Sequence, residues 1–219
     1  MPRLNVIVTC GPSLEPIDEV RRITNFSTGE LGVGLSRALT AAGFDVLCLK
    51  GSGATHPDPG PPCRVQTFDT NDDLLARLKA AARRGRVAAV FHAAALCDYR
   101  VARIRNDAGR RVRAAKIASR AGGLTLELEP ATKVIHALRP LFPRSLIVGW
   151  KYELSGTRAA ALAKARRQLA ENHTDACVVN GRAFGPGFGF CVAGARPRLL
   201  AAKPALAAFL VDWLQHGRR

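Results

Sequence analysis

Residues 25–32 (NFSTGELG) bring an amide, two hydroxyls and two glycines to the start of a predicted helix. Leu31, Leu35 and Leu39 then fall on one stripe of that helix, which we expect over residues 29–42. Free backbone N–H groups and the helix dipole favour a phosphate at such a terminus. A helix that is merely capped by Thr28 would show the same residues. This segment is therefore compatible both with a phosphate site and with a structural cap.

The elements around this segment predict an α/β protein. Short β-branched or apolar runs alternate with amphipathic stretches, which is typical of a mostly parallel sheet covered by helices. We expect strands over 5–9, 45–49, 65–68, 87–95, 123–129, 146–152 and 176–180, a hairpin-like pair over 189–193 and 198–201, and helices over 29–42, 71–84, 132–138, 156–171 and 204–216. The order predicts one three-layer Rossmann-like domain over residues 1–219, with a mostly parallel sheet.

Two stretches interrupt this alternation. Residues 10–28 form a long connection without helical or strand periodicity, and connections of this length are often functional. Residues 99–113 are polar and contain turn-forming residues, so we expect a loop or flap there. Ligands of open α/β sheets bind beyond the carboxyl ends of the strands, which directs attention to the loops after Thr9, Ala95, Lys151 and Asn180.

Familiar nucleotide fingerprints are missing from the chain. There is no G-x-x-x-x-G-K-[ST] loop, and the first strand leads to GPSLE rather than to G-x-G-x-x-G. The second strand ends at Lys50, where an acid would be needed to bind a ribose. Neither tyrosine begins a Tyr-x-x-x-Lys pair, because Arg103 and Gly156 stand at that spacing. A conventional NAD site and a short-chain reductase are both disfavoured.

The composition indicates a globular protein with an unusual charge. The net charge of +16 suggests nucleic acid or phosphorylated ligands as partners, although an Arg-rich composition spread over helix faces is a simpler explanation. The six cysteines form no C-x-x-C pair, which disfavours a zinc site or a disulfide framework. No apolar run reaches the length of a membrane span, so we expect a cytoplasmic protein without a membrane partner.

Five blocks of the chain carry motifs that occur together in one enzyme family. The first covers residues 9–34, in which EPID, VR and NFSTG are the most specific parts. The others are, in order, HAAALCDY (92–99), the Lys-Ile pair at 116–117, VGWKYE (148–153), and ACVVN (176–180) with Gly-Phe at 187–188. With these blocks the chain resembles the phosphopantothenate-cysteine ligase family, also called phosphopantothenoylcysteine synthetases. The blocks span nearly the whole chain in the order of the family.

The resemblance implies a step of coenzyme A biosynthesis in two halves. The carboxylate of 4'-phosphopantothenate attacks the α-phosphate of CTP or ATP in the presence of Mg²⁺, which gives an acyl-nucleotide and pyrophosphate. The amine of cysteine then displaces the nucleoside monophosphate and forms an amide. The decarboxylase half of many bacterial members is missing here, so we expect no flavin. A homodimer is expected because the flap of the family commonly crosses to the partner's site.

The resemblance also assigns residue roles. Asn25 would bind the acyl carboxylate or the acyl-nucleotide with support from Arg21, and Lys116 would be the mobile catalytic cation. Nucleotide contacts are assigned to Gly11, Ser27, Thr28, Gly29, Ala94, Ala95, Asp98, Lys116, Trp150, Lys151 and Lys164, and substrate contacts to Arg21, Asn25 and Asn180. No residue is assigned to a metal.

Some positions depart from the family pattern. Glu30 stands where bacterial members usually have Lys, and two lysines of the late helix are replaced near Gln168 and Asn172. Nearby cations, which are Lys164, Arg166 and Arg167, are candidate substitutes. These departures leave CTP against ATP open. They also keep a second hypothesis, a nucleotide-binding relative with a changed acyl substrate or without ligase activity.

A third hypothesis is a basic nucleic-acid-binding protein. Such proteins interleave aromatic side chains with basic ones, but only 6% of this chain is aromatic and no aromatic residue lies in 100–113. Residues 100–120 contain eight basic residues and one acid, so the charge is concentrated in the predicted flap. A local positive field beside a site for phosphorylated ligands is the interpretation that we favour over nucleic acid.

Overall fold

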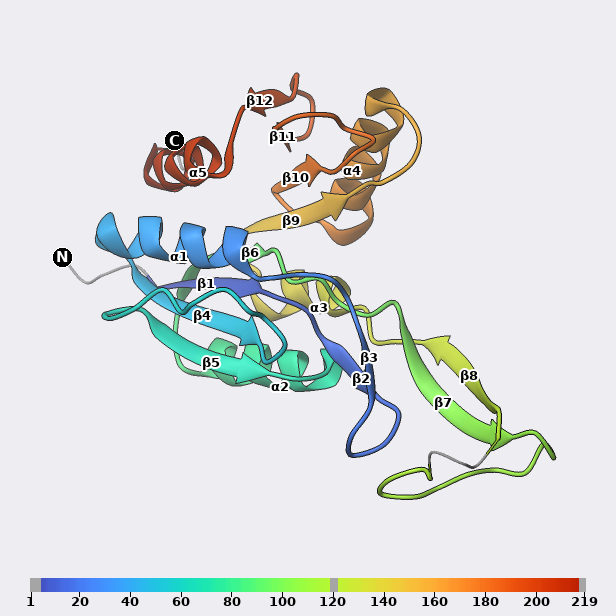
Figure 1. The fold of residues 1–219 in the computed structure, drawn as a ribbon. Coiled ribbons are helices and arrows are strands. Elements are labelled where there is room, and N and C mark those ends of the chain that lie inside the picture. Colours follow the sequence, from blue (N-terminus) through green and yellow to red (C-terminus); the bar gives the residue numbers. More distant parts are fainter. Residues whose placement is uncertain (1–4, 119–121, 217–219) are drawn as a thin grey trace.

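An eight-stranded sheet forms the centre of the computed structural model, which describes residues 5–118 and 122–216 (Figure 1). The strand order is β12-β11-β10-β9-β6-β1-β4-β5. Six strands are parallel: β1 (Asn5–Cys10), β4 (Asp45–Gly51), β5 (Arg64–Phe68), β6 (Val87–His92), β9 (Leu146–Tyr152) and β10 (Ala176–Asn180). The last two, β11 (Phe188–Cys191) and β12 (Arg198–Leu200), run antiparallel at one edge. The mostly parallel sheet confirms the predicted fold class.

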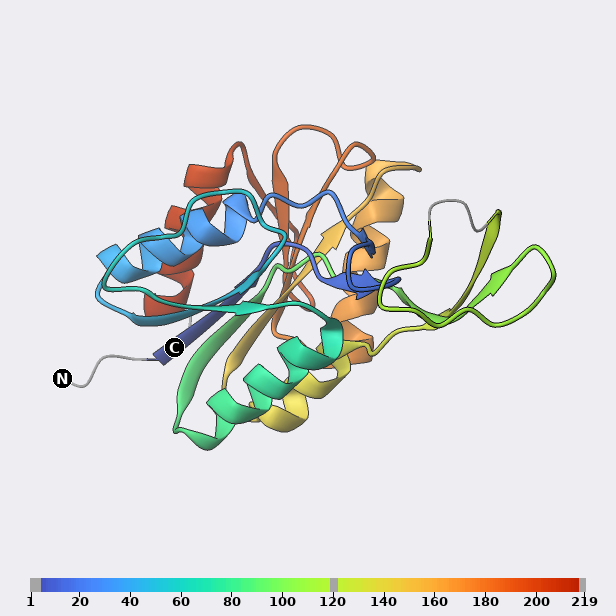
Figure 2. The same ribbon diagram turned by 60° about the horizontal axis from the view of Figure 1, so that its bottom comes forward.

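Helices cover both faces of this sheet and complete three layers (Figure 2). One face carries α1 (Glu30–Ala41) and α5 (Lys203–His216), and the other carries α2 (Asn71–Arg83), α3 (Val134–Leu141) and α4 (Arg158–Asn172). Side chains alternate along β1 accordingly: Val6 and Val8 pack in the core under α1 and α5, whereas Ile7 packs with α2 and α3. The central strands are therefore apolar on both faces, as buried parallel strands must be.

Residues 99–106 of the predicted loop or flap form a strand, so the prediction of an irregular stretch was wrong there, whereas the predicted strand over 123–129 is confirmed. β7 (Tyr99–Asn106) pairs antiparallel with β8 (Leu124–Pro130), and this β-ribbon projects from the body of the domain (Figure 1). A bulge between Val101 and Arg103 breaks the two-residue alternation of β7. Val101 and Ile104 both oppose leucines of β8, yet their spacing of three hides the strand from a periodicity argument. Arg120, which the sequence counted in the flap's charge, lies outside the described residues.

The predicted connection over residues 10–28 also contains regular structure. A short antiparallel pair, β2 (Leu14–Pro16) and β3 (Arg22–Thr24), lies within it. The start of α1 differs from the prediction as well. Gly29 occupies the cap position with φ 81°, and Thr28 Oγ1 lies 3.3 Å from the Glu30 N–H instead of capping the helix. The glycine supplies a left-handed conformation that Thr could adopt only with strain.

The loops after β1 and β6 are bonded together where the strand order reverses. The Ala95 N–H donates to the Gly11 carbonyl at 2.9 Å, and the Ser13 N–H donates to the Ala95 carbonyl at 3.1 Å. A crevice is expected at this reversal of strand order. Because the two loops are tied to each other, open space lies to the side of them, toward β9.

Candidate active site

A cavity of about 300 Å³ lies beyond the carboxyl ends of β6 and β9, between α3 and α4. Five residues that the sequence assigned to nucleotide binding line it: Ala94, Asp98, Trp150, Lys151 and Lys164. They come from the loop after β6, from β9 and from α4, so the fold brings together segments that are far apart in the sequence. The assignment of strand ends as the functional edge is thereby consistent with the observed geometry.

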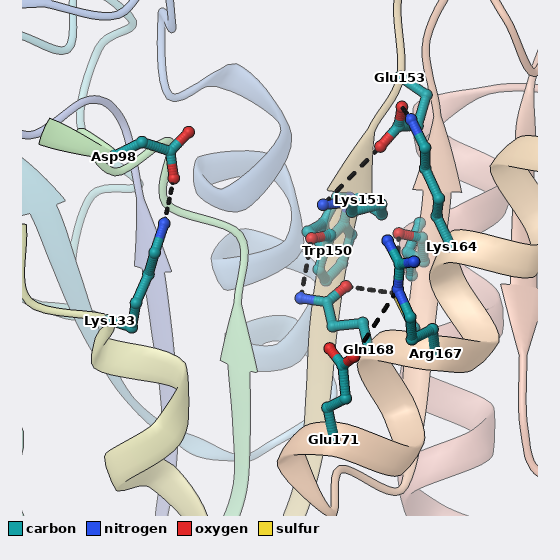
Figure 3. A network of polar contacts seen from close by, with 11 residues as sticks. Asp98, Lys133, Trp150, Lys151, Glu153, Lys164, Arg167, Gln168 and Glu171 are labelled. Carbon is teal, nitrogen blue, oxygen red and sulfur yellow. Dashed lines mark hydrogen bonds and ion pairs between the residues drawn. The ribbon is translucent and has the colours of Figure 1, made fainter. Parts of the chain in front are cut away.

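Four cations and two carboxylates line this cavity. The cations are Lys133, Lys151, Lys164 and Arg167, and the carboxylates are Asp98 and Glu171. Figure 3 shows Asp98 and Lys133 joined on one side, with the side chains of β9 and α4 on the other. Arg167 Nε lies 3.7 Å from Glu171 Oε1, whereas both Lys151 and Lys164 contact Glu153. The excess of positive charge suits an anionic ligand such as a polyphosphate.

Trp150 lines the cavity near the end of β9. It is half-buried, packs against the core on the α1 side, and its carbonyl accepts a hydrogen bond from Gln168 Nε2 at 3.3 Å. Its indole Nε1 is buried and has no hydrogen-bond partner among the described residues. Trp150 therefore contacts α4 through its backbone, while its ring packs on the α1 side of the sheet.

His92 lines the cavity as a neutral side chain. Burial lowers the pKa of His92 to about 4. Its Nδ1 lies 2.8 Å from Thr9 Oγ1, which also accepts from the Ala94 N–H at 3.3 Å. The Thr9 hydroxyl, near the end of β1, thus contacts both His92 and the loop that carries Ala94.

The first loop borders the cavity without lining it. Asn25 Nδ2 donates to the Ala95 carbonyl at 3.0 Å, and Ala95 lies between the lining residues Ala94 and Leu96. Gly11 and Gly29 are in close contact, because a Cβ on Gly29 would lie 3.5 Å from Gly11 Cα. The predicted contacts Ser27 and Thr28 follow Asn25 in this loop, with the Ser27 N–H bonded to the Asn25 carbonyl at 3.0 Å.

Arg21 and Lys116 belong to a clasp between the first loop and the segment after the ribbon. The Arg21 guanidinium donates to the Ile117 carbonyl and pairs with Asp18 at 2.9 Å. Asp18 also accepts from the Ile117 N–H at 3.1 Å, and this bond, together with those from Val20 and Arg21, lowers the pKa of Asp18. Lys116 is exposed and lies in this clasp but outside the cavity.

A second cavity, of about 250 Å³, lies beside this clasp. The ribbon, Ile17 of the first loop and Ile117 line it, together with three arginines, Arg103, Arg111 and Arg113. Arg21 therefore lies next to one cavity through Ile117, and Asn25 next to the other through Ala95. The first loop thus contacts lining residues of both cavities.

Two further predicted positions lie apart from these groups. Asn180 ends β10, and its carbonyl accepts from the Glu153 N–H at 2.9 Å, while the residue does not line either cavity. Glu30, the departure at the start of α1, pairs with Lys203 of α5, and that hydrogen bond lowers the pKa of Glu30. Because Lys203 satisfies the carboxylate, Glu30 does not present an unpaired negative charge at this helix terminus.

Several cavity residues had no assignment from the sequence. They include His92, Lys133 and the α4 residues Gln168 and Glu171. Arg167 is one of the three cations that the sequence offers as substitutes for the missing lysines. For α4 the sequence did contain a signal. Residues 167, 168 and 171 come three, four and seven positions after Lys164, and this spacing places all four on one face of a helix. Lys133 lies at the start of α3, where only the tertiary structure brings it to Asp98.

Among residues 5–118 and 122–216, no group of three or more His, Cys, Asp or Glu side chains is arranged to hold a metal ion. Over the same ranges, no helix combines the length and the apolar character that crossing a bilayer requires.

Fold and site together define a three-layer α/β protein with a cation-lined cavity at the carboxyl edge of its sheet. The family described as the DNA/pantothenate metabolism flavoprotein C-terminal domain matches residues 1–203, and the chain belongs to that family.

Two curated relatives are named "Coenzyme A biosynthesis bifunctional protein CoaBC". The protein from Thermococcus kodakarensis is 29% identical over 82% of this chain, and that from Bacillus subtilis is 28% identical over 84%. The chain spans only 42% of the length of each.

Two solved structures share the fold. The DNA/pantothenate metabolism flavoprotein from Streptococcus pneumoniae matches with a TM-score of 0.87 and 23% identity, covering 98% of this chain and 100% of that one. A mutant of Cab2 in complex with phosphopantothenate-cysteine matches with a TM-score of 0.75 and 17% identity, covering 97% and 85%.

Proposed function

We propose that this chain joins 4'-phosphopantothenate to cysteine through an acyl-nucleotide, a ligase step of coenzyme A biosynthesis. Its family membership and the names of its relatives support this activity. The observation that carries the proposal is the cavity in which Trp150, Asp98 and four cations converge. This set of groups fits a nucleoside triphosphate, which the reaction consumes.

The nucleotide would bind with its base against the indole of Trp150 and the small side chain of Ala94. The ribose hydroxyls would donate to Asp98, and the phosphates would lie against Lys151, Lys164 and the other cations of the cavity. Charge-assisted hydrogen bonds of this kind are stronger than neutral ones. They also meet the negative charge that develops as pyrophosphate leaves.

Mg²⁺ fits this site as an ion that the triphosphate brings with it. Mg²⁺ commonly keeps several waters and binds through one or two carboxylates together with substrate phosphates. Asp98 and Glu171 are the carboxylates that line the cavity, and Glu171 is the one left over if Asp98 binds the ribose. The bound ion would neutralise charge on the phosphate oxygens. The reaction needs no flavin.

The acyl substrate would enter from the other side of the first loop. Asn25 would donate to its carboxylate, which attacks the α-phosphate while pyrophosphate departs. The arginine-lined cavity beside Arg21 is the place that we assign to its phosphorylated end. Lys116 would approach the acyl-nucleotide when the ribbon moves. The amine of cysteine then attacks the acyl carbon, and the nucleoside monophosphate leaves. Asn180 is retained as a proposed substrate contact.

A homodimer and a cytoplasmic location are further parts of this proposal. The exposed apolar side chains of the ribbon favour the homodimer, because a second copy of the chain can cover them. The substrates are polar cytoplasmic metabolites, which supports the location.

The proposal is tested by incubating the protein with 4'-phosphopantothenate, cysteine, Mg²⁺ and either CTP or ATP. Mass spectrometry should detect the cysteine adduct, with pyrophosphate released in equal amount. Comparison of the two nucleotides decides which is used. If neither nucleotide yields the adduct, the ligase function is wrong.

A nucleotide-binding relative with another acyl substrate is the second candidate. It is favoured by Gln168, an uncharged side chain that lines the cavity near a position where the family resemblance implies a lysine. That candidate predicts tight triphosphate binding without adduct, and pyrophosphate release when a different carboxylic acid is supplied. Nucleic-acid binding would instead appear as salt-dependent retention of duplex DNA.

A further inference from the structure

A buried carboxylate lies behind the cavity, between two of its lysines. Glu153 directly follows β9 and is only 8% exposed. Its Oε2 accepts a hydrogen bond from Lys164 Nζ of α4, and its Oε1 lies 3.7 Å from Lys151 Nζ of β9. Figure 3 shows the three side chains meeting at the upper end of the network. Glu153 itself does not line the cavity, whereas both lysines do.

The backbone holds this carboxylate at a fixed position. The Glu153 N–H donates to the Asn180 carbonyl at 2.9 Å, and the Glu153 carbonyl accepts from the Ala183 N–H at 3.0 Å. Gly181 packs against the same peptide, and a Cβ there would lie 2.4 Å from the Glu153 carbonyl oxygen. Glu153 is therefore bonded both to the last residue of β10 and to the loop that follows β10.

A carboxylate at this place opposes the binding of an anion by its charge alone. It cancels part of the positive potential that a polyphosphate would encounter. Lysine side chains are long and rotatable, however, and an ammonium that is free to move binds an anion less well than one already held in place. The two effects have opposite signs, so removal of the charge distinguishes between them.

We propose that Glu153 is a positioning residue for the phosphates of the nucleotide. It anchors Lys164 and Lys151, which belong to different elements, so that both ammonium groups border one cavity. This inference rests on the proposed function, because it takes the ligand of the cavity to be a nucleoside triphosphate.

The variant Glu153→Gln tests the role with little change of volume. The amide has one oxygen for two ammonium groups, and its NH₂ repels the second. We expect the Kd of CTP or ATP to rise about tenfold by calorimetry, the loss expected for one charge-assisted bond. The Kd of the nucleoside without phosphates should not change. A purely structural role would weaken the nucleoside and the triphosphate alike.

A second variant shows whether Glu153 acts through Lys164. Lys164→Met should itself weaken triphosphate binding, and adding Glu153→Gln should then cost much less than it does in the native chain. Glu129→Gln is the matched control, since Glu129 pairs with Arg100 on the ribbon. It should leave nucleotide binding unchanged.

Tighter or unchanged triphosphate binding in a folded Glu153→Gln variant overturns the inference, as do additive losses in the double variant. If Glu153→Gln does not fold, Glu153→Asp keeps the charge but withdraws it by one methylene. If Glu153→Asp binds the triphosphate more weakly but binds the nucleoside as before, the positioning role is supported. An unchanged Kd for the triphosphate contradicts it. If the native chain makes the adduct and Glu153→Gln binds the triphosphate as tightly as the native chain does, only the positioning role is wrong. If the native chain binds no triphosphate, the proposed function itself fails.

Discussion

Asn25 holds a donor next to the cavity through its bond to the Ala95 carbonyl, at 3.0 Å. In Asn25→Asp this donor is lost, and the new carboxylate repels both the carbonyl and an acyl carboxylate. We expect turnover to fall about 100-fold or more, as for loss of one transition-state donor, with nucleotide affinity largely retained. Adduct formation and calorimetry measure the two quantities.

The same substitution in the ribbon provides the control for Asn25. Asn106 Oδ1 accepts from the Arg110 N–H at 3.0 Å, and an aspartate oxygen can accept in the same way. Asn106→Asp should keep full turnover. Normal turnover in Asn25→Asp would show that Asn25 does not have the proposed role.

His92 makes stability depend on pH. Its folded pKa of about 4 lies below the ordinary value of 6.5, so between these values the unfolded chain binds the proton more strongly. Stability is therefore fully present above pH 6.5 and is lost as the pH falls toward 4, by about 3 kcal/mol for this group. Urea unfolding at pH 7 and pH 5 should show a steeper loss for the native chain than for His92→Asn. Equal losses would contradict this explanation.

Substituting alanine for either of two glycines near the start of α1 should change the free energy of unfolding in opposite directions. Gly29 has φ 81°, and a Cβ on it would lie 3.0 Å from Ala54 Cβ. Gly34 lies inside the helix, and a Cβ on it would meet nothing within 4 Å. Gly29→Ala should lower the free energy of unfolding by about 1–2 kcal/mol, and Gly34→Ala should raise it by about 0.5–1 kcal/mol. Chemical denaturation of both variants measures this, and a shift of the same sign in both would refute the argument.

The elements that local patterns specify were predictable, and those that depend on long-range pairing were not. The buried run of β6 and the leucine stripe of α1 are visible in the sequence because their periodicity is local. Of the two strands of the ribbon, β8 was predicted, but β7 was missed because its bulge shifts Ile104 out of alternation with Val101. At the site, strand ends indicated Trp150 and Lys151, but no local pattern joins Lys133 to Asp98.

The positive charge of residues 100–113 is partly neutralised in the folded molecule. The arginine-rich stretch after Tyr99 was interpreted as a local positive field. In the folded chain, Arg100 pairs with Glu129, and both Arg103 and Arg105 pair with Glu127. Because those acids come from β8, which lies well beyond the arginines in the sequence, the ribbon is less positive than the segment alone. The positive charge that remains includes Arg111 and Arg113, which line the second cavity and form no ion pair among the described residues.

The ribbon also makes a prediction about assembly. A two-stranded ribbon is marginally stable alone and needs an apolar surface to pack against. On β7 and β8, Tyr99 is 58% exposed and Leu128 is 49% exposed, and the ribbon extends away from the sheet (Figure 1). A second copy of the chain can cover these side chains, so we expect a dimer in sedimentation equilibrium. Leu128→Lys should raise the dimer's Kd about tenfold or more, because it buries a charge.

Leu199→Lys is the control for this prediction, since Leu199 is similarly exposed on β12 at the far edge of the sheet. If the ribbon forms the interface, only the Leu128 variant dissociates. Equal dissociation of both variants would show that the ribbon is not the interface. A native chain that sediments as a monomer at every concentration would contradict the dimer. Because the ribbon leads into the segment that carries Lys116, loss of the dimer should also lower ligase turnover while triphosphate binding in the β6–β9 cavity persists. That combination would show that dimer formation affects the use of the acyl substrate and not the binding of the nucleotide.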